Sequence, residues 1–181
     1  DEWQGGIYAA YGITENITID TIGIRYRFMD RPRENHGLEM TAGIGIRGAL
    51  ESRINGDALG IGADVTGKYV FNDDMAVTFG IGYIHWDEDK LDDKREFDYS
   101  IGFQKNLIED LTFSASYTYR DLDDFAQSSA YAYSAGLNYN VQRNVDVGVF
   151  YSKTDFEFEK NGYDIDDNLT DGYGLYVTYR F

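Results

Sequence analysis

Large apolar residues alternate with small or polar residues along most of the chain. In the segment LTFSASYTY at 111–119, Leu, Phe, Ala and Tyr occupy every second position, with Thr and Ser between them. A period of two is the spacing of a β-strand with one apolar face. Ten such segments are predicted, at residues 3–13, 17–28, 37–50, 58–71, 75–86, 96–105, 111–121, 130–140, 145–154 and 171–181. The pattern therefore predicts an all-β protein with a single domain over residues 1–181.

The face opposite the apolar side chains carries Gly, Ala, Ser, Thr and isolated charges. In a soluble barrel the apolar, tyrosine-rich side chains would have to point inward, and the interior of a ten-stranded barrel is too narrow to hold them. The reverse orientation works, with apolar side chains toward lipid and small or charged ones toward a lumen. A closed barrel also pairs every backbone N–H and C=O group inside the bilayer. We therefore predict a closed antiparallel transmembrane β-barrel of ten strands, with eight strands as the alternative.

Charged residues on the polar face are predicted to form a network in the lumen. The set consists of Arg25, Arg27, Glu39, Arg47, Asp64, Lys68, Asp98, Asp146 and Arg180. Charges in a poorly hydrated interior are tolerated when they are paired. We expect Asp146 to meet Arg180 across neighbouring strands, and Arg27 to meet Glu39. The hypothesis is a salt-bridged constriction near the periplasmic end that leaves the lumen largely occluded; independent, solvated charges are the alternative.

The predicted connections alternate between short and long. Short turns are expected at 71–75, 106–110 and 140–144, and longer acidic segments such as WDEDKLDDKREF lie between them. Short turns face the periplasm in outer-membrane barrels, so the long loops are expected outside and both termini in the periplasm. With ten strands and a periplasmic C-terminus, strand parity places the turn at 14–16 outside. Its sequence, YGITENITI at 11–19, instead resembles the short turn YNVQRNVDV at 139–147, which favours the periplasm. The alternation slips near Asp20, which predicts a β-bulge there.

Composition narrows the classes of function. Asp and Glu outnumber Lys and Arg by 32 to 16, a formal net charge of −16, which argues against nucleic-acid binding. The chain has no Cys, hence no thiol nucleophile and no Cys-ligated zinc. Its two His residues argue against a His-based metal site. No apolar run is long enough for a transmembrane helix, and no cofactor is predicted.

The last segment, DGYGLYVTYRF, resembles the C-terminal strand of small bacterial outer-membrane β-barrel proteins. It ends on Phe181, and apolar residues occupy the alternate positions before it: Tyr173, Leu175, Val177 and Tyr179. The resemblance implies a location in the outer membrane of a Gram-negative bacterium. It also implies that the barrel assembly machinery recognises this strand. It identifies no subfamily, and the fold alone does not define the function.

Three functions are compatible with this pattern. The leading hypothesis is a non-enzymatic, monomeric barrel whose acidic loops meet lipopolysaccharide with its divalent cations, host surfaces or partner proteins. A porin-like narrow pore for small solutes or ions is the alternative. The third is a surface hydrolase, similar to omptin-type proteases, that uses His85 beside Asp87; an exposed His at the rim is the simpler interpretation. The segment YDIDDNLTDG at 163–172 offers oxygen ligands for Ca²⁺ but lacks the spacing of an EF-hand loop.

Overall fold

The chain folds as a single antiparallel sheet in which each strand pairs with the next strand in the sequence. The computed structural model describes residues 9–31, 36–50, 58–89, 92–157 and 171–180. The strands are β1 (Ala10–Gly12), β2 (Ile17–Asp20), β3 (Gly23–Met29), β4 (Gly37–Leu50), β5 (Ala58–Asn72), β6 (Met75–Glu88), β7 (Lys94–Ile108), β8 (Leu111–Asp123), β9 (Ser129–Gln142), β10 (Val145–Phe156) and β11 (Asp171–Tyr179). No helix in these ranges is long and apolar enough to span a membrane.

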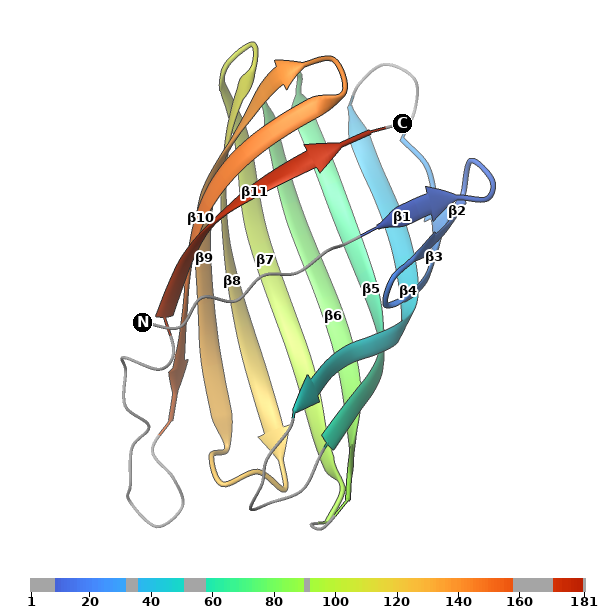
Figure 1. The fold of residues 1–181 in the computed structure, drawn as a ribbon, viewed down its shortest axis with the longest axis vertical. Helices are drawn as coiled ribbons and strands as arrows, with labels where there is room; N and C mark the ends of the chain where they lie inside the picture. The colour runs from blue at the N-terminus through green and yellow to red at the C-terminus, as the bar shows by residue number, and fades with distance from the viewer. Residues whose placement is uncertain (1–8, 32–35, 51–57, 90–91, 158–170, 181) are drawn as a thin grey trace.

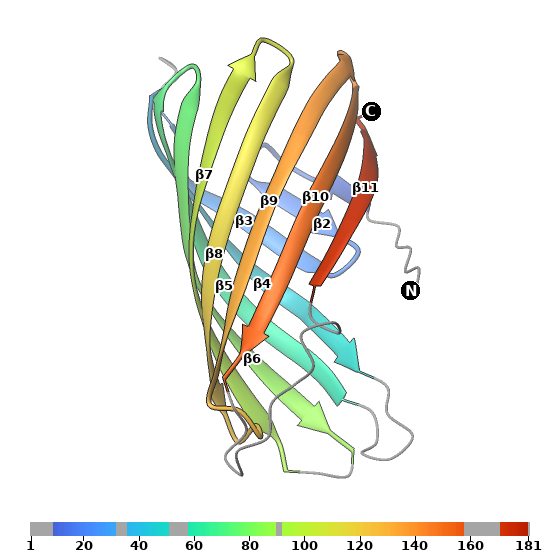
Figure 2. The same ribbon diagram turned by 90° about the vertical axis from the view of Figure 1, so that its left-hand side faces the viewer.

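The sheet curls into a trough whose long strands, β4 to β10, stand side by side (Figures 1 and 2). We call the space on its concave side the lumen. The short strands β1, β2 and β3 lie together beside β4 (Figure 1). The edges of the sheet are β1 and β11, and no ladder joins them within the described residues. The predicted antiparallel all-β architecture is therefore confirmed, whereas closure stays a prediction.

The described residues form eleven strands, not ten, because the predicted strand at 17–28 is a hairpin. Ile19 pairs with Ile24 and Asp20 pairs with Gly23, so the chain reverses where a bulge was expected. The Asp20 carboxylate accepts a hydrogen bond from the Ile22 N–H at 2.9 Å, a local bond that stabilises the turn. The extra strand makes β1 and β11 run in the same direction, so strand parity no longer places both termini on one side.

The two ends of the sheet differ in the length of their connections. Two residues separate β5 from β6, β7 from β8 and β9 from β10, and we call this the short-turn end. Longer segments join β4 to β5, β6 to β7, β8 to β9 and β10 to β11 at the opposite end, which we call the long-loop end. The connection from β3 to β4, residues 30–36, is also longer but lies at the short-turn end. Because β2 runs antiparallel to β3, the turn at 14–16 is directed toward the short-turn end. This direction agrees with the local similarity to 139–147 rather than with the parity argument.

The convex face is apolar and exposed. Ile44, Ile81 and Ile101 are 60%, 59% and 57% exposed. On β7 the convex positions between Arg95 and Lys105 hold Phe97, Tyr99, Ile101 and Phe103. This apolar stretch approaches the roughly nine to eleven residues that a tilted strand needs to cross a bilayer. The convex face therefore has the length and chemistry of a lipid-facing surface.

The β2–β3 hairpin contacts β4 through two facing glycines. Gly23 pairs with Gly45, and a Cβ added to Gly45 would lie 2.6 Å from the Cα of Gly23. The Ile46 N–H also donates a hydrogen bond to the Ile22 carbonyl at 2.7 Å. A side chain at either glycine would push the hairpin away from the rest of the sheet.

We predict that Gly45→Ala destabilises the folded protein by about 1–3 kcal/mol, because the added methyl group overlaps the neighbouring backbone. Urea unfolding of protein reconstituted in lipid vesicles measures the change. Gly172→Ala is the matched control, since a Cβ at Gly172 would meet nothing within 4 Å. Equal midpoints for the two variants would show that the glycine contact does not hold the hairpin.

Candidate functional site in the lumen

All nine charged residues predicted for the lumen lie on the concave side of the sheet, and six of them belong to three separate groups. The first group joins β3, β4 and β5. Asp64 accepts hydrogen bonds from Arg47 and, at 3.2 Å, from Arg25 Nη1. Arg25 also lies 3.7 Å from Asp20. Gly43 leaves room for this group, because a Cβ there would be 3.0 Å from Asp64 Oδ2 and 3.3 Å from each guanidinium.

A second group lies nearer the long-loop end and includes Glu96, which is 1% exposed. Arg120 Nε donates to Glu96 Oε1 at 2.6 Å, and Trp86 Nε1 donates to Glu96 Oε2 at 3.0 Å. Asp98 lies 3.7 Å from Arg120 Nε. The Asp98 Oδ1 atom is buried without a hydrogen-bond partner among the described residues. Arg120 thus faces two carboxylates and is the cation that holds this group together.

Sequence reasoning found Asp98 but missed Glu96, Arg120 and Trp86. Glu96 and Asp98 are two residues apart on one strand, so their shared face could have been inferred from the period of two. Trp86 and Arg120 each begin an acidic segment, WDEDKLDDKREF and RDLDDFAQSS respectively. This position suggests a loop residue and not a side chain in the lumen. Their role depends on the register that brings β6, β7 and β8 together.

Apolar packing closes part of the lumen beside this second group. Trp86, Ile84 and Ala58 are buried together, with Phe125 packed against them. The Trp86 ring covers two glycines, since a Cβ at Gly48 would be 2.6 Å and one at Gly60 would be 3.1 Å from ring atoms. This buried apolar cluster lies toward the long-loop end, whereas the constriction was predicted at the other end.

The third group, at the short-turn end, contains one of the two predicted pairs. Arg180 donates to Asp146 Oδ2, and Asn140 Nδ2 donates to Asp146 Oδ1 at 2.8 Å. The predicted pair between Arg27 and Glu39 is wrong.

Glu39 is instead held by Arg31, whose Nε lies 2.8 Å from its carboxylate. Arg27 donates to the Glu15 carbonyl at 2.6 Å. The regular register of β3 on β4 places Arg27 opposite Thr41, and a bulge after Arg27 then pairs Met29 with Met40 instead of Glu39. Arg31, beyond the bulge, reaches Glu39 instead. Lys68 lies directly across from Glu39 on β5, but it forms no ion pair within the described residues.

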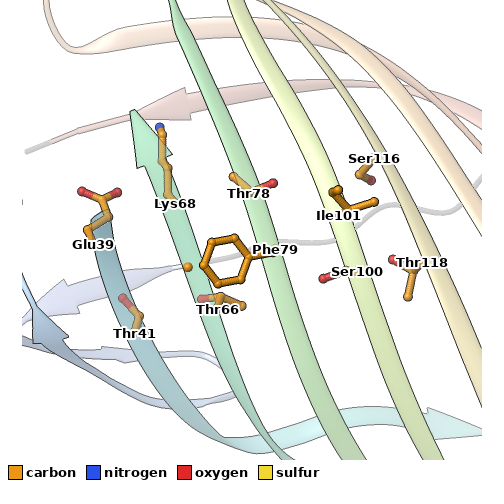
Figure 3. Close-up of a pocket in the computed structure, with 11 residues that line it drawn as sticks. Glu39, Thr41, Thr66, Lys68, Thr78, Phe79, Ser100, Ile101, Ser116 and Thr118 are labelled. Atoms are coloured by element: carbon orange, nitrogen blue, oxygen red, sulfur yellow. The ribbon is translucent and has the colours of Figure 1, made fainter. Parts of the chain in front are cut away.

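Between the charged groups the lumen wall is lined by hydroxyl groups. A cavity of about 350 Å³ is bordered by Thr41, Thr66, Thr78, Ser100, Ser116 and Thr118, with Glu39 and Lys68 at one side (Figure 3). Gly67, Phe79 and Ile101 complete its wall. A second cavity of about 270 Å³ adjoins it, because Thr66, Ser100 and Thr118 border both. Arg25, Arg47, Asp64 and Asp98 line the second cavity. The middle of the lumen therefore combines open space, small polar side chains and charges at its margins.

The remaining predicted sites lie elsewhere. His85 is on the convex side near the long-loop end, with its Nε2 atom 3.5 Å from Asp93 Oδ2, and both side chains are about half exposed. In the described ranges no three metal-ligating side chains gather, and most of the segment 163–172 lies outside those ranges. Of the residues predicted to form the assembly signal, Tyr173, Leu175, Val177 and Tyr179 are exposed on β11, and Phe181 lies outside the described residues.

A sequential antiparallel sheet with an apolar convex face and a polar lumen defines the class of outer-membrane β-barrel proteins. Residues 6–181 match the Gram-negative porin family, and the chain belongs to this family. The predicted bacterial outer-membrane location and porin-like class are thereby confirmed. No curated protein matches the sequence significantly.

Solved structures with similar folds are remote in sequence. The NanC porin aligns with a TM-score of 0.64 and 12% identity, covering 96% of this chain and 91% of that one. OmpT, an outer membrane protein of Vibrio cholerae, aligns with a TM-score of 0.56 and 15% identity over 98% of this chain. An anion-selective porin from Comamonas acidovorans aligns with a TM-score of 0.58, 9% identity and 96% coverage of this chain. The chain spans 62% of the OmpT chain and 58% of the Comamonas porin.

We predict that Arg120→Met destabilises the protein by about 3–5 kcal/mol, because it leaves the buried Glu96 carboxylate without a counter-charge. Adding Glu96→Gln should recover most of this loss, since the buried anion is then gone. Arg95→Met is the control: Arg95 and Asp123 are more than half exposed and 3.7 Å apart, so a change under about 1 kcal/mol is expected. Urea unfolding in lipid vesicles measures the change in unfolding free energy for the two single variants and the double variant. If Arg120→Met destabilises no more than Arg95→Met, Arg120 is not the essential counter-charge of Glu96.

Proposed function

We propose that the protein is a non-enzymatic channel that passes small polar solutes or ions across the outer membrane. The observation that carries the proposal is the pair of adjoining cavities in the middle of the lumen, which share the hydroxyl-bearing residues Thr66, Ser100 and Thr118 in their walls. Hydroxyl groups both donate and accept hydrogen bonds, so they replace part of the hydration of a passing solute without binding it tightly. Membership of the Gram-negative porin family supports the same function.

The proposal includes a closed barrel in the membrane. An unpaired strand edge in hydrocarbon leaves N–H and C=O groups without partners, at several kcal/mol for each group. The edges to be joined are those of β1 and β11. We place the short-turn end in the periplasm and the long loops outside, as is usual for bacterial barrels. The C-terminal end of β11 then faces the periplasm, in agreement with a role of that strand in recognition by the assembly machinery.

An occluded barrel is the second candidate, and the packing around Trp86 favours it. In that case the acidic long-loop end would provide the function, by contact with lipopolysaccharide, its divalent cations or a partner protein. Acidic side chains are frequent there, among them Asp87, Asp89, Asp92, Asp93, Asp121, Asp123, Asp124 and Glu157. The two candidates differ in whether current flows through the lumen.

The hydrolase hypothesis receives less support from the structure. A general base acts on a nucleophile within hydrogen-bonding distance, and His85 is paired instead with Asp93 on the lipid-facing side of β6. Its neighbours across the sheet are Ile61 and Arg95. This position agrees with a His at the boundary of the membrane.

Planar-bilayer recordings test the channel. We predict discrete conductance steps for the parent protein and a several-fold smaller step for Ser100→Trp, because the indole would occupy space bordering both cavities. Tyr99→Trp is the matched control on the adjacent, convex position of β7, where the side chain is 50% exposed and borders neither cavity, and it should leave the step unchanged. A parent protein that inserts but carries no current would overturn the channel in favour of the occluded barrel, and equal steps for the two variants would show that current does not pass the cavities.

A further inference from the structure

Two aromatic side chains on the lumen side remain exposed, in contrast to other large apolar residues there. Phe150 is 42% and Tyr176 is 38% exposed, whereas Ile84, Trp86 and Leu122 are 6–7% exposed. Exposed apolar residues on the convex face meet lipid, but those on the concave face meet water in the lumen. Leaving two ring faces in water forgoes about 25 cal/mol for each Å² of apolar surface that could be buried. The pair therefore suggests a surface that a passing molecule covers.

A glycine on the neighbouring strand lets each ring lie against the backbone. Phe150 on β10 pairs with Gly174 on β11, and Gly148 on β10 pairs with Tyr176 on β11. Each ring covers the glycine opposite it: a Cβ at Gly174 would be 2.7 Å from the Phe150 ring, and one at Gly148 would overlap the Tyr176 ring. The ring centroids are 6.4 Å apart with an interplanar angle of 39°. One face of each ring lies against a strand, and the other is left to the lumen.

Neutral polar groups surround the rings. The Tyr176 hydroxyl donates to Asn138 Oδ1 at 3.1 Å, and the Ser116 and Ser134 hydroxyls lie 2.7 Å apart on the neighbouring strands β8 and β9. Asp146, two residues before Gly148 on the same face of β10, is paired with Arg180. This part of the wall, on adjacent strands along one side of the molecule (Figure 2), thus offers amides and hydroxyls without a net charge.

We propose that this wall of β9, β10 and β11 binds sugars, meaning cyclic, uncharged polyhydroxy solutes. A sugar ring has an apolar C–H face that packs on an aromatic ring, and its hydroxyls at the rim exchange hydrogen bonds with amides and hydroxyls. An apolar surface with a few placed polar groups is the usual composition of a small-molecule site. The proposal rests on the proposed function, because the solute has to enter the lumen.

A purely structural role is the competing explanation. The same contact occurs between β5 and β6, where the Phe79 ring covers Gly67: a Cβ there would lie 2.3 Å from the ring. Rings over glycines can simply stabilise strand pairing. The two explanations differ in one respect: a structural role needs only bulk, whereas sugar binding needs a flat ring open to the lumen.

Saturation-transfer NMR on the purified protein, in a detergent without a sugar headgroup, measures binding of maltose and of sorbitol. Sorbitol has hydroxyls but no ring face. We expect transfer to the ring C–H protons of maltose and at least tenfold less to sorbitol. The variant Phe150→Leu with Tyr176→Leu should lose at least tenfold of the maltose signal, whereas Tyr151→Leu, on the convex side of the same strand, should retain it.

Heat-modifiable migration on gels shows whether each variant is folded. If the double variant does not fold, Phe150→Leu and Phe150→Tyr replace it: the tyrosine should retain maltose transfer and the leucine should lose it. Equal transfer to maltose and sorbitol, or full maltose transfer in the leucine variants, would overturn the proposal. Because binding is measured without current, a parent protein that conducts but does not bind maltose refutes only this site, and one that binds but does not conduct refutes only the channel.

Discussion

A strand that crosses a bilayer has no water to satisfy its backbone N–H and C=O groups, so neighbouring strands must satisfy them. The structure meets this constraint with an unbroken series of antiparallel ladders from β1 to β11. Only consecutive strands pair, which keeps every connection at one end or the other. The pairing fixes the direction of each side chain, and the apolar convex face and polar lumen both depend on it.

Once the faces are set, glycines decide where the lumen is filled and where it is open. Gly48 and Gly60 make room for Trp86, and Gly43 makes room for the pairs of Asp64. Between these groups the wall carries Ser and Thr, which are too small to fill the space, and the two cavities result. Ten or eleven strands lie near the size at which side chains can just fill a barrel. The distribution of small and large residues therefore determines whether solutes pass.

The sequence predicts the long strands well because their period of two directly reports the two faces; the strand predicted at 37–50 coincides with β4. It does not reveal the hairpin of β2 and β3, whose turn has neither Pro nor an Asn-Gly signal and lets apolar positions resume at Ile22 and Ile24. The ion-pair partners also escape prediction, since the register shifts at a bulge after Arg27 and Glu39 is bound by Arg31. Asp146 and Arg180 were predictable as neighbours on adjacent strands. Phe150 and Tyr176 were missed because their ring positions depend on glycines across the sheet.

The most direct test of this account asks which side chains on one strand face lipid and which face water. Because the chain has no native Cys, Ser100→Cys and Tyr99→Cys can each carry a single label in reconstituted vesicles. We predict that a fluorophore at Tyr99→Cys is quenched by a lipid-phase quencher and shielded from a small aqueous one. A fluorophore at Ser100→Cys should show the opposite. Equal aqueous quenching at both positions, or lipid quenching at Ser100→Cys, would contradict the assignment of the two faces.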